Sequence, residues 1–143
     1  MLENAHVLAT VTAGGLHDGP VLTTRRIRLF LIVLLASSGV LHFLVPAPFV
    51  AIVPRSLPHP DELVAISGAA ELLCAGLLAH PSARRLGGPA SAALFAAVFP
   101  ANVSMALRSG SRPWWFRVIA WVRLPLQIPL IVGALRAGRA RER

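Results

Sequence analysis

The sequence predicts an all-α membrane protein, an antiparallel bundle of four transmembrane helices with a short interfacial segment between helices 1 and 2. Composition supports this class first: 55% of the 143 residues are hydrophobic and 14% are charged, well to the apolar side of a soluble domain. Second, the chain contains four apolar runs, each about as long as a membrane span. Third, arginines gather at the ends of these runs. The length allows one domain.

The first apolar run is Ile27 to Leu44. Its eighteen residues would form a helix about 27 Å long, close to the thickness of the hydrocarbon layer. Residues 1–24 before it show no sustained hydrophobic period, and we expect them to form a flexible cytoplasmic tail. The four-helix transmembrane domain is expected to occupy residues 25–137, followed by a basic cytoplasmic C-terminus at 138–143.

A proline-rich segment separates the first run from the second. The apolar residues 49–53 within it are too few to cross a membrane, so this segment is expected at the outer interface. Pro60, Asp61 and Glu62 then predict a helix start, because proline has a helical φ and acidic side chains are favoured at the positive end of a helix. The second span is expected to run from Pro60 to about Ala79.

Residues 81–89 hold two arginines and a Gly-Gly pair, which predicts a short cytoplasmic turn. The third span is expected over residues 90–107. It contains Pro100, which lacks an N–H, so the carbonyl of Ala96 needs another donor from a neighbouring group.

The fourth span follows a brief polar loop. Trp114, Trp115 and Phe116 predict an aromatic belt at its start, at the level of the lipid headgroups. Its end is expected near Leu135.

The net charge of +8 comes from arginine alone, since the chain has no lysine. Nucleic-acid binding would require these residues along one face, whereas they lie at the ends of apolar runs. Because arginine is enriched on the cytoplasmic side, the richer side predicts cytoplasmic N- and C-termini in an inner (plasma) membrane. The use of arginine without lysine suggests a bacterial source. The richer side has Arg25, Arg26, Arg28, Arg84, Arg85, Arg136, Arg139, Arg141 and Arg143, and the opposite side has Arg55, Arg108, Arg112 and Arg117.

The single cysteine, Cys74, lies inside an apolar run. It has no intrachain partner, so the sequence has neither a disulfide framework nor the dithiol pair of disulfide-generating membrane enzymes. We interpret Cys74 as a small buried apolar residue.

Polar side chains inside the spans are the candidate functional residues, because an ionisable group at a span centre costs on the order of 2.5 to 3.5 kcal/mol. Glu71 lies nine residues after Glu62, about 13 Å below the outer surface. Arg123 reaches a similar depth from the tryptophan belt. We therefore predict an ion pair between Glu71 and Arg123.

Further polar residues share this half of the bundle and suggest one polar axis. Three interpretations are open: interhelical hydrogen bonding, a ligand or quinone pocket, and a proton path. The chain shows no metal-ligand spacing, nucleophile elbow or phosphate loop, and His42 has no second axial haem ligand at its depth. The candidate residues are His42, Ser67, Glu71, Asn102, Arg123 and Gln127.

Several short motifs, in this order, resemble the DoxX-like family of small membrane proteins over residues 28–135. They are Gly39-Val40-Leu41-His42-Phe43, Pro46, Phe49, Ile52-Val53-Pro54, Leu57-Pro58, Leu63-Val64, Ser67-Gly68, Glu71 and Phe99-Pro100-Ala101-Asn102. The resemblance implies a four-helix bundle with His42, Glu71 and Asn102 as family-like polar positions. It also implies a role near quinone reduction or thiol balance, although the chain lacks the further cysteines that thiol transfer would need.

Three functions follow as hypotheses. The leading one is an accessory membrane subunit that docks a redox or envelope partner and holds a quinone or lipid near His42 and Glu71. The second is a quinone-reducing enzyme subunit with a proton relay through Glu71 and His42. The third is a small transporter-like protein, for which a homo-oligomer would supply the missing repeat.

Overall fold

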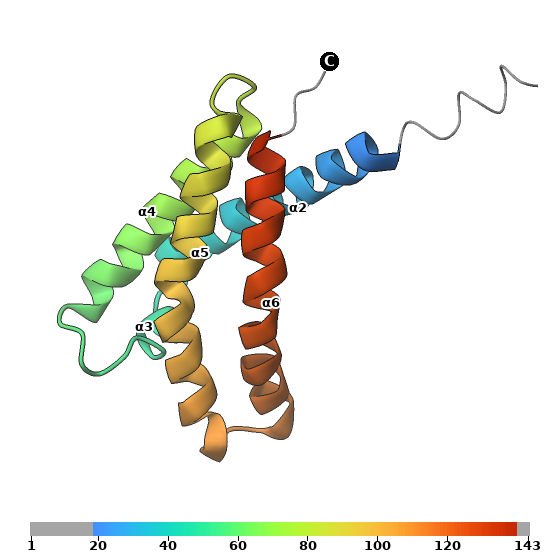
Figure 1. The fold of residues 1–143 in the computed structure, drawn as a ribbon. Helices are drawn as coiled ribbons and strands as arrows, with labels where there is room; N and C mark the ends of the chain where they lie inside the picture. The colour runs from blue at the N-terminus through green and yellow to red at the C-terminus, as the bar shows by residue number, and fades with distance from the viewer. Residues whose placement is uncertain (1–18, 140–143) are drawn as a thin grey trace, which may run out of the picture.

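The computed structural model describes residues 19–139, which are helical apart from short connections (Figure 1). No strand occurs in this part of the chain, which confirms the all-α prediction. The elements are α2 (Gly19–Leu44), α3 (Ala47–Val50), α4 (Pro60–Ala79), α5 (Arg84–Leu107), the 3₁₀ helix η1 (Arg108–Ser111) and α6 (Trp114–Arg139).

Four of these helical segments are long and apolar enough to cross a membrane. Their outward faces are also apolar: Leu44 is 72% exposed, Leu73 64% and Trp114 76%. The chain does not cover these side chains itself, and such surfaces are suited to lipid rather than water. The fold is that of a multi-pass membrane protein. The spans are Thr24–Leu44, Pro60–Ala79, Arg84–Ser111 and Trp114–Arg139.

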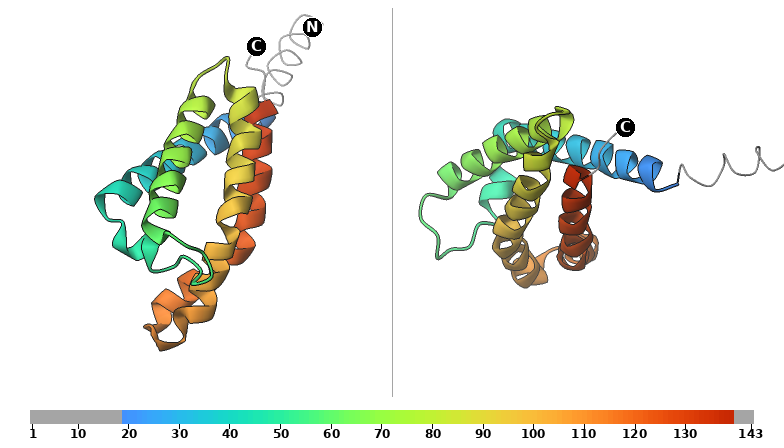
Figure 2. Two further views of the ribbon diagram at one scale, coloured as in Figure 1. Left: turned by 90° about the vertical axis from the view of Figure 1, so that its left-hand side faces the viewer. Right: turned by 45° about the horizontal axis from the view of Figure 1, so that its top comes forward.

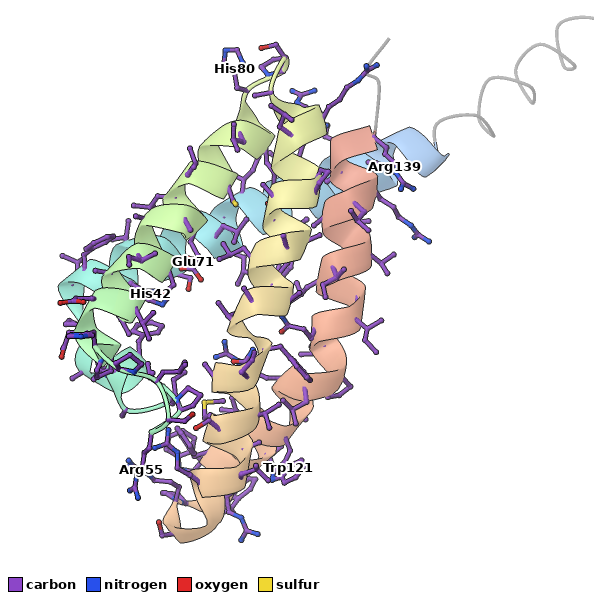
Figure 3. All side chains as sticks on the ribbon, turned by 60° about the vertical axis from the view of Figure 1, so that its left-hand side comes forward. His42, Arg55, Glu71, His80, Trp121 and Arg139 are labelled. Carbon is purple, nitrogen blue, oxygen red and sulfur yellow. The ribbon has the colours of Figure 1, made fainter. Side chains whose placement is uncertain are left out.

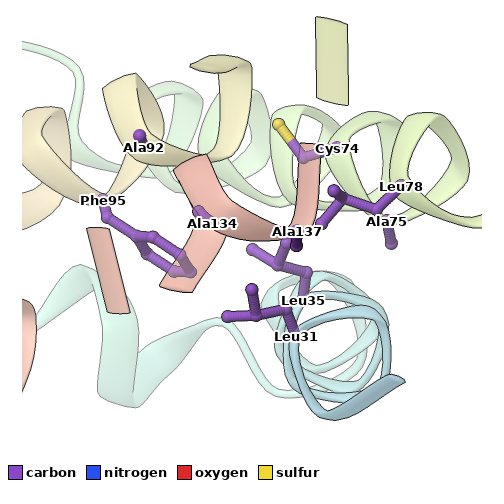
Figure 4. Close-up of a cluster of buried hydrophobic side chains, with 9 residues drawn as sticks. All are labelled: Leu31, Leu35, Cys74, Ala75, Leu78, Ala92, Phe95, Ala134 and Ala137. Carbon is purple, nitrogen blue, oxygen red and sulfur yellow. The ribbon is translucent and has the colours of Figure 1, made fainter. Parts of the chain in front are cut away.

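The helices pack most extensively in two pairs, α2 with α4 and α5 with α6, and the α4–α5 and α2–α6 contacts join the pairs. Figure 2 shows α5 and α6 side by side and α2 inclined to them. Apolar side chains from all four helices form the main core (Figure 4). The core residues are Leu31, Leu35, Cys74, Ala75, Leu78, Ala92, Phe95, Ala134 and Ala137. The buried position predicted for Cys74 is confirmed.

The observed boundaries agree with the sequence prediction at Leu44, at Leu107 and at both ends of α4. Helix α2 instead begins at Gly19, so it extends into the segment 1–24 that was predicted to be a tail; residues 1–18 lie outside the described range. Pro20 is compatible with this start, because the first helical turn needs no N–H donor. Helix α6 continues past Leu135 to Arg139, into the predicted C-terminal segment 138–143.

The prediction of a turn over residues 81–89 is wrong beyond residue 83, because α5 begins at Arg84. The Gly-Gly pair lies inside the helix and permits close packing. A Cβ atom on Gly87 would lie 2.8 Å from the backbone of Leu77, and one on Gly88 would lie 2.7 Å from the carbonyl oxygen of Ala134. The glycines therefore bring α5 close to α4 and to α6.

The crossing of α2 and α4 also depends on glycine. A Cβ atom on Gly68 would lie 2.6 Å from the Cβ of His42, and one on Gly39 would lie 2.9 Å from the carbonyl oxygen of Gly68. Both distances are shorter than side chains tolerate, so the two backbones approach only because these residues have no side chain. This close approach places His42 of α2 beside Glu71 of α4.

Candidate functional site

The candidate site is a largely buried pair of ionisable side chains, His42 and Glu71. The Nδ1 atom of His42 lies 3.2 Å from Oε2 of Glu71, and the side chains are 10% and 12% exposed. Figure 3 shows the two residues together where α2 and α4 face each other. The prediction that these residues share a site inside the spans agrees with this geometry.

A backbone contact fixes the proton of His42. Nδ1 lies 2.8 Å from the carbonyl oxygen of Ser38, one turn earlier in α2. A carbonyl only accepts hydrogen bonds, so Nδ1 carries a proton and donates it. The ring also stacks on Phe49 of α3, with centroids 3.8 Å apart. The other ring nitrogen, Nε2, has no hydrogen bond to the described residues.

Glu71 has an unused acceptor. Its Oε2 atom is buried and has no hydrogen-bond partner among the described residues. The nearby Nδ1 proton of His42 is directed to Ser38, so the contact between His42 and Glu71 is electrostatic in the main. A buried carboxylate oxygen without a donor is costly, because it has lost its hydration. The pair is therefore able to accept a hydrogen bond from a further group.

The predicted ion pair between Glu71 and Arg123 is wrong. In the described part of the chain, His42 and not Arg123 lies within salt-bridge distance of Glu71. Helix α4 packs chiefly on α2 and α5, so an α2 side chain reaches Glu71 first. Depth along the span could not predict which helix lies next to Glu71.

Arg123 is exposed, yet it lies on the same side of α6 as two buried residues. Ala120 precedes it by three positions and Gln127 follows by four, and residues at these spacings share one face of a helix. Arg123 is thus on the side of α6 that carries buried residues.

A second polar pair joins α5 and α6. Nδ2 of Asn102 donates to Oε1 of Gln127 at 3.2 Å, and both residues are 5% exposed. Nε2 of Gln127 donates to the carbonyl oxygen of Phe95, the residue before Ala96, where Pro100 led us to expect an outside donor. The sequence therefore identified both residues as polar candidates, but it predicted neither their hydrogen bond nor the Phe95 carbonyl as the acceptor.

The predicted single polar axis is divided in the structure. Ser67 donates to the carbonyl oxygen of Val64 at 3.0 Å, within its own helix. No hydrogen bond between described residues connects the His42–Glu71 pair with the Asn102–Gln127 pair. The six candidates thus form two pairs, with Ser67 satisfied locally and Arg123 apart.

Sequence reasoning missed the role of Arg108, which it used only for topology. Its Nη2 atom donates to the carbonyl oxygens of Ala51 and Val53 at 3.0 and 2.9 Å, and Nε donates to Ser104 at 3.4 Å. Arg108 therefore fastens the segment after α3 to the end of α5. The only available signal was an arginine directly after an apolar run, which topology alone also explains.

A family model described as "Domain of unknown function (DUF8561)" matches residues 31–138. The chain belongs to this family. The DUF8561 match includes both polar pairs and Arg108. No curated protein and no solved structure matches the chain. The resemblance of this DUF8561 chain to the DoxX-like family stays a prediction.

Proposed function

We propose that this DUF8561 protein is an accessory membrane subunit that binds the polar head of a quinone or lipid at the His42–Glu71 pair and docks a redox or envelope partner. The observation that supports it is the buried Oε2 atom of Glu71, which has no hydrogen-bond donor. The DoxX-like resemblance at His42 and Glu71 points to the same site and to a quinone-linked role.

The protonation of His42 defines the ligand chemistry. With one proton on Nδ1, the neutral ring presents Nε2 as an acceptor, and the Glu71 carboxylate is a second acceptor. Two acceptors suit a ligand that donates through hydroxyl groups, such as a quinol or the hydroxylated head of a lipid. Protonation of Nε2 would convert it into a donor for a quinone carbonyl. The same pair could then bind either redox form.

The proposal includes an orientation in the membrane. The four spans run antiparallel, α3 lies at the outer interface, and both termini are in the cytoplasm of a bacterial inner membrane. Figure 3 shows His80 and Arg139 at one end of the molecule and Arg55 at the other. The arginine-rich end would be cytoplasmic, and the His42–Glu71 pair would lie in the outer half of the membrane.

The test is extraction of bound quinone or lipid from the full chain purified in mild detergent, with mass spectrometry of the extract. Glu71→Gln keeps the shape of the side chain and removes its charge. We expect a loss of the co-purifying molecule of roughly fivefold or more, because the amide is uncharged and has one acceptor oxygen where the carboxylate has two. Glu62→Gln is the matched control, since Glu62 also lies on α4 and pairs with a histidine, His59, at 3.5 Å, but is 71% exposed.

Retention of the molecule by wild type and by Glu62→Gln, with loss from Glu71→Gln, supports the proposal. Absence of quinone and of specific lipid from the wild type, or equal retention by both variants, contradicts it. Proton relay is the alternative, favoured by the 3.2 Å approach of two proton-exchanging groups. It predicts that Glu71→Gln lowers the rate of quinone reduction with the partner while quinone remains bound.

A further inference from the structure

We propose a second ligand site, for the phosphate head and acyl chain of an anionic phospholipid, in a cavity at the α5–α6 turn. The cavity has a volume of about 380 Å³. It lies between the segment around α3 and the end of the α5–α6 hairpin. It is distinct from the His42–Glu71 pair, neither member of which lines it, and does not depend on the proposed function.

The walls of the cavity are apolar, and its charged groups are all positive. Ala47, Ile52, Met105 and Phe116 provide apolar surface, Arg108 and Arg112 provide two guanidinium groups, and no carboxylate lines it. An anionic head with an apolar chain matches both features. Free phosphate would match only the arginines and would leave the apolar walls uncovered.

Hydrogen bonds hold Arg108 in place, and none of them neutralises its positive charge. Its three hydrogen-bond acceptors are the neutral carbonyls of Ala51, Val53 and Ser104. These bonds use Nε and Nη2, and no ion pair within the described residues involves Arg108. The Nη1 donors therefore remain for a ligand, on a guanidinium that has already been ordered.

Arg112 lines the same cavity, next to Phe116. Its guanidinium is 5.7 Å from the centre of the Phe116 ring, and it forms no ion pair with a described residue. Two positive charges therefore face one cavity without a protein anion. An external anion would lower their mutual repulsion as well as bind to each.

The position of the cavity in the membrane favours a lipid as the source of that anion. Trp114 and Trp115, 76% and 53% exposed, begin α6 beside Arg112 and Phe116. Exposed tryptophans at the end of an apolar span are typical of headgroup depth. At that depth the phosphate of a membrane lipid meets the guanidinium groups, and its acyl chain follows the apolar walls.

The test is native mass spectrometry of the full chain in neutral detergent, with phosphatidylglycerol and phosphatidylcholine of identical acyl chains. We expect phosphatidylglycerol to be retained preferentially and Arg112→Gln to weaken its binding about fivefold, the usual contribution of one arginine near anionic lipid. Arg117→Gln is the matched control: it removes the same charge from an exposed residue of the same region that does not line the cavity. It should change binding less than twofold.

Arg108→Gln is a second variant, read together with thermal unfolding because Arg108 also fastens the segment after α3. It should weaken phosphatidylglycerol binding at least as much as Arg112→Gln. Equal retention of the two lipids, an equal loss from Arg117→Gln, or displacement of phosphatidylglycerol by millimolar inorganic phosphate would each overturn the proposal. Persistent preference for phosphatidylglycerol in excess inorganic phosphate supports it.

Discussion

Individual polar residues in these spans are satisfied in different ways, and the differences define their roles. Asn102 and Gln127 bond to each other and to the backbone of Phe95, so they connect α5 and α6. Ser67 bonds within its own helix. Among the side chains of residues 24–139, only the Glu71 carboxylate combines a buried oxygen, an adjacent ionisable partner and a free acceptor. Glu71 is therefore the residue that would gain a hydrogen bond from a bound ligand.

The Asn102–Gln127 pair should contribute to stability. Asn102→Ala and Gln127→Ala each remove one side of a buried interhelical hydrogen bond, and a double-mutant cycle should give a coupling free energy of about 0.6 kcal/mol, as for similar bonds in membrane proteins. Unfolding of the full chain in detergent micelles, followed by circular dichroism, measures it. Ser67→Ala is the control and should show no coupling to Asn102→Ala. Additive effects of Asn102→Ala and Gln127→Ala would contradict the pairing.

At the scale of helices, close packing is achieved with glycine and alanine rather than with large side chains. Gly39 and Gly68 meet where α2 crosses α4, and Gly88 meets Gly138 where α5 packs on α6; a Cβ on Gly88 would lie 2.8 Å from the Cα of Gly138. Without a hydrophobic force between helices in lipid, such close backbone contacts provide much of the association. The glycine contacts thereby set the geometry of the His42–Glu71 pair.

Two glycines of α4 provide a matched test of this packing. A Cβ on Gly68 would lie 2.6 Å from the Cβ of His42, whereas one on Gly76 would meet nothing within 4 Å. Gly68→Ala should therefore destabilise the protein by about 1–3 kcal/mol through overpacking. Gly76→Ala should be neutral or stabilising by up to about 1 kcal/mol, because alanine is the better helix former. Equal thermal unfolding midpoints for the two variants in detergent would contradict the crossing geometry.

The sequence was sufficient for the spans and insufficient for their partners. Length, hydropathy and the Pro60-Asp61-Glu62 start predicted α4 from end to end. The Gly-Gly pair led to the wrong prediction of a turn. Glycine is common in water-exposed turns, but in a membrane protein it also permits close contacts between helices. The depth of Glu71 in its span indicated Arg123 as its partner. The actual neighbour of a side chain in a bundle depends on the rotation and order of the helices, which hydropathy does not encode. Arg108 was missed because two of its three acceptors are backbone carbonyls more than fifty positions away.

The whole molecule is a thin bundle with little interior. In each candidate span, between 17% and 33% of the most apolar 18-residue stretch is buried by the chain, and the lowest value belongs to α6. Large side chains such as Trp121 and Ile128 on α6 are more than half exposed. The surroundings must therefore cover most of the apolar surface, and lipid does so in a multi-pass membrane protein.

Orientation is the prediction that concerns the molecule as a whole. If the arginine-rich end is cytoplasmic, the α4–α5 connection faces the cytoplasm and the α5–α6 turn faces the opposite side. Ser82 and Ser111 are exposed at these two ends, and the native Cys74 is buried, so single cysteines can report on each end. In intact cells a membrane-impermeant maleimide should label Ser111→Cys but not Ser82→Cys. In permeabilised cells both variants should be labelled, and the wild type should remain unlabelled throughout.

Labelling of Ser82→Cys alone in intact cells would show the inverse topology. It would also place the two-arginine cavity and the His42–Glu71 pair towards the cytoplasmic face, where any docking partner would then have to be sought.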